Sequence, residues 1–107
     1  MGKLVRDRIP EIIQTDGGSP RVTKLAGNEL RQALLDKLLE ESTEAAESPT
    51  DRLLEELADV HEVILALLEA NGWTVQQLVE VRQTKERSRG AFTEALYLHE
   101  DNDKEQN

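Results

Sequence analysis

The sequence predicts a mainly α-helical fold, in which an antiparallel helical hairpin is followed by a third helix. Two long stretches, 28–47 and 51–71, place apolar residues at three- and four-residue steps, and Ser48-Pro49-Thr50 separates them. Proline lacks an amide hydrogen and disfavours helix in the residue before it, so the first helix should stop just before this break. Asn71-Gly72 should end the second helix, and residues 74–89 resume the helical spacing.

The segments around the hairpin are assigned in chain order. Residues 6–14 should form a short helix, because its isoleucines are helically spaced, and the glycines and proline of 15–20 indicate a loop. Residues 21–25 alternate polar and apolar side chains, which is compatible with a short strand that could pair with 94–98. Three residues are expected to act as N-caps of the long helices: Asn28, Thr50 and Thr74.

The length of 107 residues predicts one domain, residues 1–98, followed by a charged, apolar-poor tail, 99–107, that should be disordered. With one Trp, one Tyr and one Phe, the core must be built mainly from aliphatic side chains. The apolar positions of the second helix are too widely spread around it for one neighbour to cover. A small chain of this kind is expected to form a homo-oligomer, a dimer or a tetramer, as an extended helical bundle.

The composition argues against several classes of protein. The absence of cysteine excludes disulfides, thiolate metal sites and a cysteine nucleophile. A formal net charge of −9 argues against nucleic acid as a partner, because such binding depends on Lys and Arg neutralising phosphates. No apolar segment approaches transmembrane length, and no apolar run follows the N-terminal charges as in a signal peptide. We therefore expect a cytoplasmic protein without a membrane partner.

Acidic residues recur at a three-residue step on both long helices. Glu41 and Glu44 share a face of the first helix, and Glu56 and Asp59 share a face of the second. The two pairs are symmetric about position 50, so an antiparallel hairpin folded there brings them to one level. Four carboxylates at one level repel unless cations lie among them, and hard cations such as Mg²⁺ or Mn²⁺ prefer oxygen ligands.

These residues also carry a family resemblance. Glu40-Glu41-Ser-Thr-Glu44 followed by Glu56-Leu-Ala-Asp59 resembles the EExxE…ExxD signature of the all-α nucleoside triphosphate pyrophosphohydrolases, the MazG-like superfamily that includes phosphoribosyl-ATP pyrophosphohydrolase. The opening run from Lys3 to Ile13 and the late run from Lys85 to Phe92 are similar to a small house-cleaning branch of these enzymes. The late run has Arg89-Gly90-Ala91-Phe92 where Arg-Gly-Gly-Phe is often found.

The resemblance implies a hydrolase that converts a nucleoside triphosphate, or a nucleotide-like substrate, to the monophosphate and pyrophosphate. It implies Mg²⁺, with Mn²⁺ as a possible substitute, held by Glu41, Glu44, Glu56 and Asp59. It further implies a catalytic role for Glu41 and Glu40, although Glu40 could equally be an exposed acid at helical distance from Lys37. The resemblance assigns the phosphates to five basic residues: Lys3, Arg6, Arg8, Lys85 and Arg89.

Other interpretations of the same residues stay open. Arg6 could pair with Asp7 or Glu11 for structural reasons, and the acids could be solvated residues on amphipathic helices. A non-catalytic helical interaction module would then use the exposed leucines to bind a partner. A sensor of Mg²⁺-nucleotide would keep the metal site without turnover.

Overall fold

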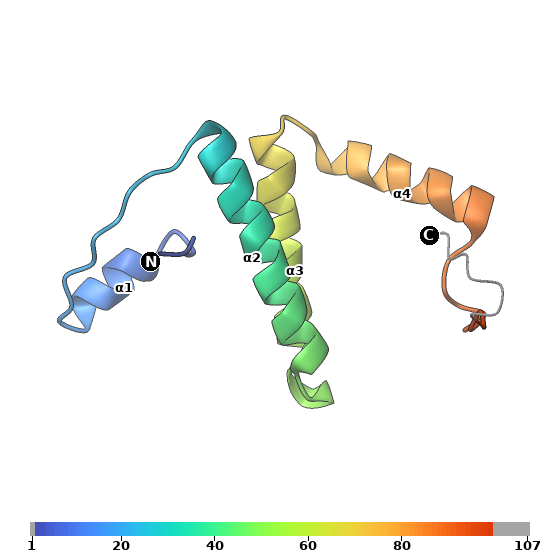
Figure 1. The fold of residues 1–107 in the computed structure, drawn as a ribbon, viewed down its shortest axis with the longest axis horizontal. Coiled ribbons are helices and arrows are strands. Elements are labelled where there is room, and N and C mark those ends of the chain that lie inside the picture. Colours follow the sequence, from blue (N-terminus) through green and yellow to red (C-terminus); the bar gives the residue numbers. More distant parts are fainter. Residues whose placement is uncertain (1, 100–107) are drawn as a thin grey trace. The chain divides into compact units, whose positions relative to one another are not determined.

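The computed structural model describes residues 2–99, and these residues contain four helices and no strand (Figure 1). The helices are α1 (Ile9–Thr15), α2 (Gly27–Glu47), α3 (Thr50–Ala70) and α4 (Val75–Arg89). The chain divides into two compact units between Trp73 and Thr74. The first unit holds α1, α2 and α3, and the second unit holds α4. The prediction of a mainly α-helical fold is confirmed.

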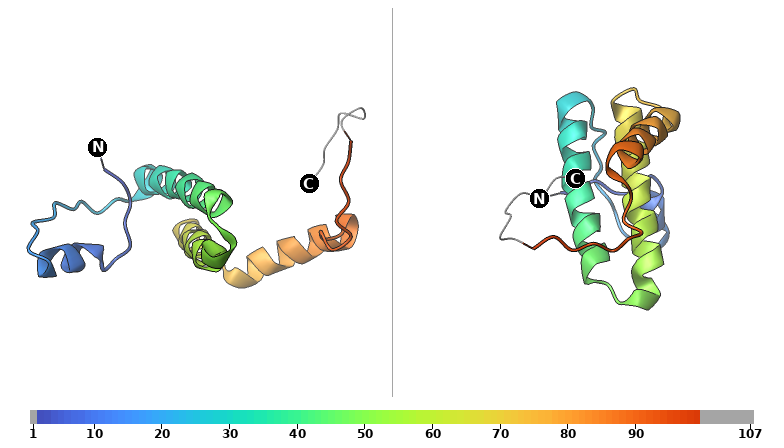
Figure 2. Two further views of the ribbon diagram at one scale, coloured as in Figure 1. Left: turned by 90° about the horizontal axis from the view of Figure 1, so that it is seen from below. Right: turned by 90° about the vertical axis from the view of Figure 1, so that its right-hand side faces the viewer.

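The hairpin of α2 and α3 is the centre of the first unit. Figures 1 and 2 show the two helices side by side and joined at one end by a short connection. The buried apolar side chains of the described residues all come from this pair, and they are Leu34, Ala45, Val63 and Leu68. Leu34 is the most buried of them, with 4% of its surface exposed. The core is therefore aliphatic, as the composition predicted.

Ser48 and Pro49 make the connection between α2 and α3, where the break was predicted. The extended backbone of Ser48 and Pro49 ends one helix and begins the next. The Ser48 hydroxyl donates to the Ala45 carbonyl at 2.9 Å, and the Arg52 amide donates to the Pro49 carbonyl at 3.0 Å. These bonds use backbone groups that helix ends leave without an intrahelical partner.

The predicted N-caps differ in outcome. Thr74 caps α4 as expected: its hydroxyl accepts from the Gln77 amide at 3.0 Å, and the Gln77 side chain accepts from the Thr74 amide at 2.7 Å. The prediction for Asn28 and Thr50 was wrong by one or two residues. The N-cap positions are Ala26 and Pro49, which have extended backbones and provide no side-chain cap.

The two short strands predicted for residues 21–25 and 94–98 are absent from the described residues. Residues 21–25 lie in an irregular segment that leads to α2. The second segment begins in a turn, in which the Ala95 amide donates to the Phe92 carbonyl at 3.2 Å and Ala95 has a φ of 54°. A strand requires a partner for its backbone groups, and alternation over five residues does not provide one. Residues 100–107 of the predicted tail lie outside the described residues.

Several large apolar side chains of the hairpin face solvent. Leu54 on α3 is 80% exposed and Leu57, one turn further, is 48% exposed, while Leu39 on α2 is 69% exposed. No described side chain of the chain is completely buried. The hairpin alone therefore leaves part of its apolar surface uncovered. None of the helices in residues 2–99 combines the length and the apolar run that a bilayer crossing requires.

Candidate metal centre

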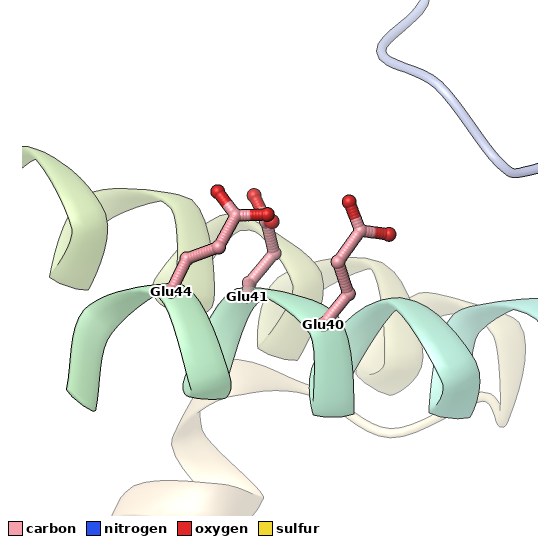
Figure 3. Close-up of side chains that lie close together, drawn as sticks. All are labelled: Glu40, Glu41 and Glu44. Atoms are coloured by element: carbon pink, nitrogen blue, oxygen red, sulfur yellow. The ribbon is translucent and has the colours of Figure 1, made fainter. Parts of the chain in front are cut away.

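The acidic group on α2 is the main chemical feature of the hairpin. Glu40, Glu41 and Glu44 each offer a carboxylate oxygen, and these three oxygens lie within 4.8 Å of one another. Figure 3 shows the three side chains rising from the same side of α2. Their spacing of one, three and four residues on a helix of 3.6 residues per turn produces this arrangement.

Glu41 is the buried member of the group. It is 9% exposed, and it forms no hydrogen bond or ion pair within residues 2–99. Burial raises the pKa of the Glu41 carboxyl, and the negative charge of Glu44 raises it further, whereas Lys37 lowers it and Asp59 and Glu40 raise it. A buried carboxylate without a partner is costly, so this position favours a ligand that supplies positive charge.

The predicted cation ligands on α3 are Glu56 and Asp59, and neither belongs to the group on α2. Asp59 is close enough to Glu41 to raise the pKa of that carboxyl across the hairpin, although Asp59 is not one of the three mutually close acids. The Oε2 atom of Glu56 is buried and has no hydrogen-bond partner among the described residues. A buried acceptor without a partner usually indicates a missing water or ion.

Positive charges from the N-terminal segment, residues 2–8, reach these acids. The Arg6 Nη2 atom donates to Asp59 Oδ1 at 2.6 Å, and its Nη1 atom lies 4.0 Å from Glu62 Oε1. Lys3 Nζ lies 3.7 Å from Glu40 Oε2, an oxygen that also accepts from Lys37 Nζ at 3.4 Å. Two of the predicted phosphate-binding residues therefore contact carboxylates of the predicted site.

The other predicted phosphate-binding residues either form a local pair or belong to the second unit. Arg8 donates through Nε to Glu11 Oε1 at 2.9 Å, which is a local pair at the start of α1. Lys85 and Arg89 are exposed residues of α4 and belong to the second unit. Arg6 does not follow the alternative of pairing with Asp7 or Glu11, because it precedes α1 and extends to the hairpin instead.

Two residues of the site were not assigned by the sequence. Glu62 contacts Arg6, and its position three residues after Asp59 on the same helical face was the available signal. Lys37 appeared only as a helical neighbour of Glu40, yet its ammonium also lowers the pKa of Glu41. Its side chain is 16% exposed, so its charge is screened less than those of the surface lysines.

The donor set is made entirely of carboxylate oxygens, which are suitable ligands for a hard divalent cation such as Mg²⁺ or Mn²⁺. The unpartnered carboxylate of Glu41 and the unpartnered oxygen of Glu56 agree with that donor set. Comparisons of the chain with models of protein families, with curated proteins and with solved structures found no match.

Proposed function

We propose that this protein is a metal-dependent pyrophosphohydrolase that cleaves a nucleoside triphosphate, or a nucleotide-like substrate, to the monophosphate and pyrophosphate. The observation that carries the proposal is Glu41, a residue 9% exposed that forms no hydrogen bond within residues 2–99 and whose carboxylate oxygen lies within 4.8 Å of those of Glu40 and Glu44. The resemblance of these acids, and of Glu56 and Asp59, to the MazG-like signature supplies the reaction. A house-cleaning role in the cytoplasm is part of the same proposal.

In this proposal Glu41, Glu44, Glu56 and Asp59 hold the cation. When bound, Mg²⁺ would neutralise phosphate oxygens and lower the pKa of water, which is the chemistry that metal ions supply in phosphoanhydride hydrolysis. Glu40 is near enough to Glu41 and Glu44 to orient a water molecule for attack on the α-phosphorus and to accept its proton.

The bond between the α-phosphorus and the bridging oxygen breaks in this reaction, and pyrophosphate leaves. Lys3 and Arg6 are the two predicted phosphate-binding residues that contact these acids, and they are suited to bind phosphate oxygens electrostatically. The roles of Arg8, Lys85 and Arg89 at the phosphates rest on the resemblance alone.

A homo-oligomer, dimer or tetramer, belongs to the same proposal. The exposed leucines of the hairpin support it, because Leu54 and Leu57 share one face of α3 and Leu54 is 80% exposed. Exposed apolar side chains that gather on one helix are typical of surfaces that bind another chain. The same leucines also support the second candidate function, a non-catalytic module that binds a different helical partner.

Pyrophosphate release from a panel of nucleoside triphosphates, with Mg²⁺ and with Mn²⁺, tests the proposal. We expect turnover of at least one nucleotide by the wild type and a loss of about tenfold or more in Asp59→Asn, since Asp59 is assigned to the cation. Glu55→Gln is the matched control, because Glu55 is an exposed acid of the same helix.

The outcomes separate the candidate functions. Cation and nucleotide binding without release would favour the Mg²⁺-nucleotide sensor. A protein whose melting temperature responds neither to the cations nor to the nucleotides would favour the interaction module, since only ligands that bind the native state raise its stability.

A further inference from the structure

The contacts of Arg6 with the hairpin are tertiary, and Arg6 lies in the N-terminal segment, which is not part of any helix. Arg6 and Asp59 are 53 residues apart in sequence, and their ion pair at 2.6 Å is the shortest one within residues 2–99. The N-terminal segment reaches acids of both hairpin helices, because Lys3 contacts Glu40 of α2 while Arg6 contacts Asp59 of α3.

A local ion pair with Glu11 was an alternative for Arg6, but in the structure Arg8 makes this pair. Arg8 pairs with Glu11 within α1, three residues away. Arg6 instead brings its guanidinium to an acid whose side chain is 34% exposed, next to the buried Glu41. Leu4 lies between the two basic residues and is half-buried. The contacts that attach the segment to the hairpin are the ion pairs of Lys3 and Arg6.

A guanidinium at Asp59 and a divalent cation among the same acids compete electrostatically. Both are attracted by the charge of the Asp59 carboxylate, and two positive charges a few ångströms apart repel. The acidic group alone would not indicate a ligand. The second observation is a pair of desolvated acids: Glu41 is 9% exposed and forms no hydrogen bond within residues 2–99, and the Oε2 atom of Glu56 is buried without a hydrogen-bond partner among the same residues.

We propose that the N-terminal segment is a strap that neutralises the acids when no cation is bound, and that cation binding displaces Arg6 from Asp59 and releases the segment. This inference rests on the proposed function, because it assumes that the acids bind a divalent cation. It adds a competitor within the chain: Arg6 occupies Asp59 before the cation does, and once displaced it is free to meet the phosphates of an incoming substrate.

The expected effect of Arg6 on the affinity for the cation follows from the strength of its ion pair with Asp59. Arg6 is 56% exposed, and exposed ion pairs of this kind shift an equilibrium by about two- to five-fold. Removing the guanidinium should therefore tighten Mn²⁺ binding by about two- to five-fold. The effect should require removal of this particular charge, because charges beyond about 8 Å are largely screened at physiological salt.

Isothermal titration with Mn²⁺ alone on the full chain tests the competition directly. Arg6→Gln should bind Mn²⁺ more tightly than wild type by the factor above, and Arg6→Lys, which keeps the charge, should remain near wild type. Arg8→Gln is the matched control, since it removes the same charge from the neighbouring position but breaks only the local pair with Glu11. It should leave Mn²⁺ affinity unchanged.

Release of the segment can be followed with one label, because the chain contains no cysteine. A fluorophore on Gly2→Cys reports the mobility of the segment. Addition of Mg²⁺ should lower its anisotropy in the wild-type background and leave it unchanged in a Glu41→Gln background. In an Arg6→Gln background the anisotropy should be low before Mg²⁺ is added.

Two results would contradict the strap, and only the second would also contradict the metal site. If wild type binds Mn²⁺ but Arg6→Gln has the same affinity and the label does not respond to Mg²⁺, the strap is wrong and the metal site stands. If neither wild type nor Arg6→Gln binds Mn²⁺ or Mg²⁺, the metal site of the proposed function is wrong as well, and the strap with it.

Discussion

Replacing Glu41 with Gln should stabilise the cation-free protein. The substitution keeps the shape of the side chain and removes a charge that is 9% exposed and has no hydrogen bond to lose. The oxygens of Glu40, Glu41 and Glu44 lie within 4.8 Å of one another. Two unit charges at 4.8 Å repel by about 0.9 kcal/mol in water and about 3.5 kcal/mol at an effective dielectric constant of ~20.

The lower part of that range applies, because Glu44 is exposed and Glu40 is paired with lysines. We expect the free energy of unfolding to rise by about 1–2 kcal/mol in EDTA at pH 7.5. For a chain of about 100 residues, each kcal/mol raises the melting temperature by about 4–8 °C. Glu55→Gln, an exposed acid on α3, is the control for net charge and should change stability by less than about 0.5 kcal/mol.

The gain should depend on pH with a definite sign. The pKa of Glu41 is raised from its ordinary value of 4.5, chiefly by burial, so the folded state binds this proton more tightly than the unfolded state. Stability contributed by the protonated carboxyl is fully present below pH 4.5 and is lost as the pH rises through the raised pKa. The advantage of Glu41→Gln should therefore be absent in acid and complete above the raised pKa.

Magnesium should reverse the order of the two proteins. At a Mg²⁺ concentration 100 times its dissociation constant, wild type gains about 2.7 kcal/mol, whereas Glu41→Gln gains little. Thermal denaturation in EDTA and in Mg²⁺ measures both effects. A variant less stable than wild type in EDTA, or one that keeps the full response to Mg²⁺, would refute the reasoning about Glu41.

Three further predictions concern packing, assembly and capping. Leu34→Ala should cost about 2–5 kcal/mol in chemical denaturation because Leu34 is 4% exposed, while Leu39→Ala on the same helix, 69% exposed, should cost less than about 1 kcal/mol. Leu54→Gln should lower the mass measured by light scattering if α3 forms the interface of a homo-oligomer, and an unchanged mass would place the interface elsewhere. Thr74→Ala should destabilise α4 by about 1 kcal/mol, with Thr74→Ser close to wild type, as judged by amide exchange in residues 75–89.

The hairpin was predictable because its signals are local. Pro49 interrupts the helical pattern by its own chemistry, and the three-residue acid step fixes which face Glu41 and Glu44 share. Two caps were predicted wrongly, since Asn28 and Thr50 are good capping residues that lie inside the helices, one or two positions after the N-caps. The prediction of a strand at 21–25 was wrong. Alternating polar and apolar side chains indicate only which face each side chain would occupy, and a strand also needs a neighbouring strand that no local pattern specifies.

In the candidate site, too, the features set by local helix geometry were predictable and those set by tertiary packing were not. Glu40, Glu41 and Glu44 come together through helix geometry alone, and the three-residue step predicted the shared face of Glu41 and Glu44. The pairing of Arg6 with Asp59 depends on the path of a segment that belongs to no helix, so spacing could not distinguish it from the local pair that Arg8 makes. Burial also depends on tertiary packing, which is why only the structure distinguishes Glu41 from the exposed Glu44.

The short connection at Ser48 and Pro49 has a consequence for the order in which the molecule is made. The acids assigned to the cation and to catalysis lie between Glu40 and Asp59, and two residues join their helices. Closing so short a loop costs little entropy, and contacts between near neighbours in sequence form fast. The N-terminal segment and the hairpin precede α4 in the chain, so the acids and their internal counterions can assemble before α4 has left the ribosome.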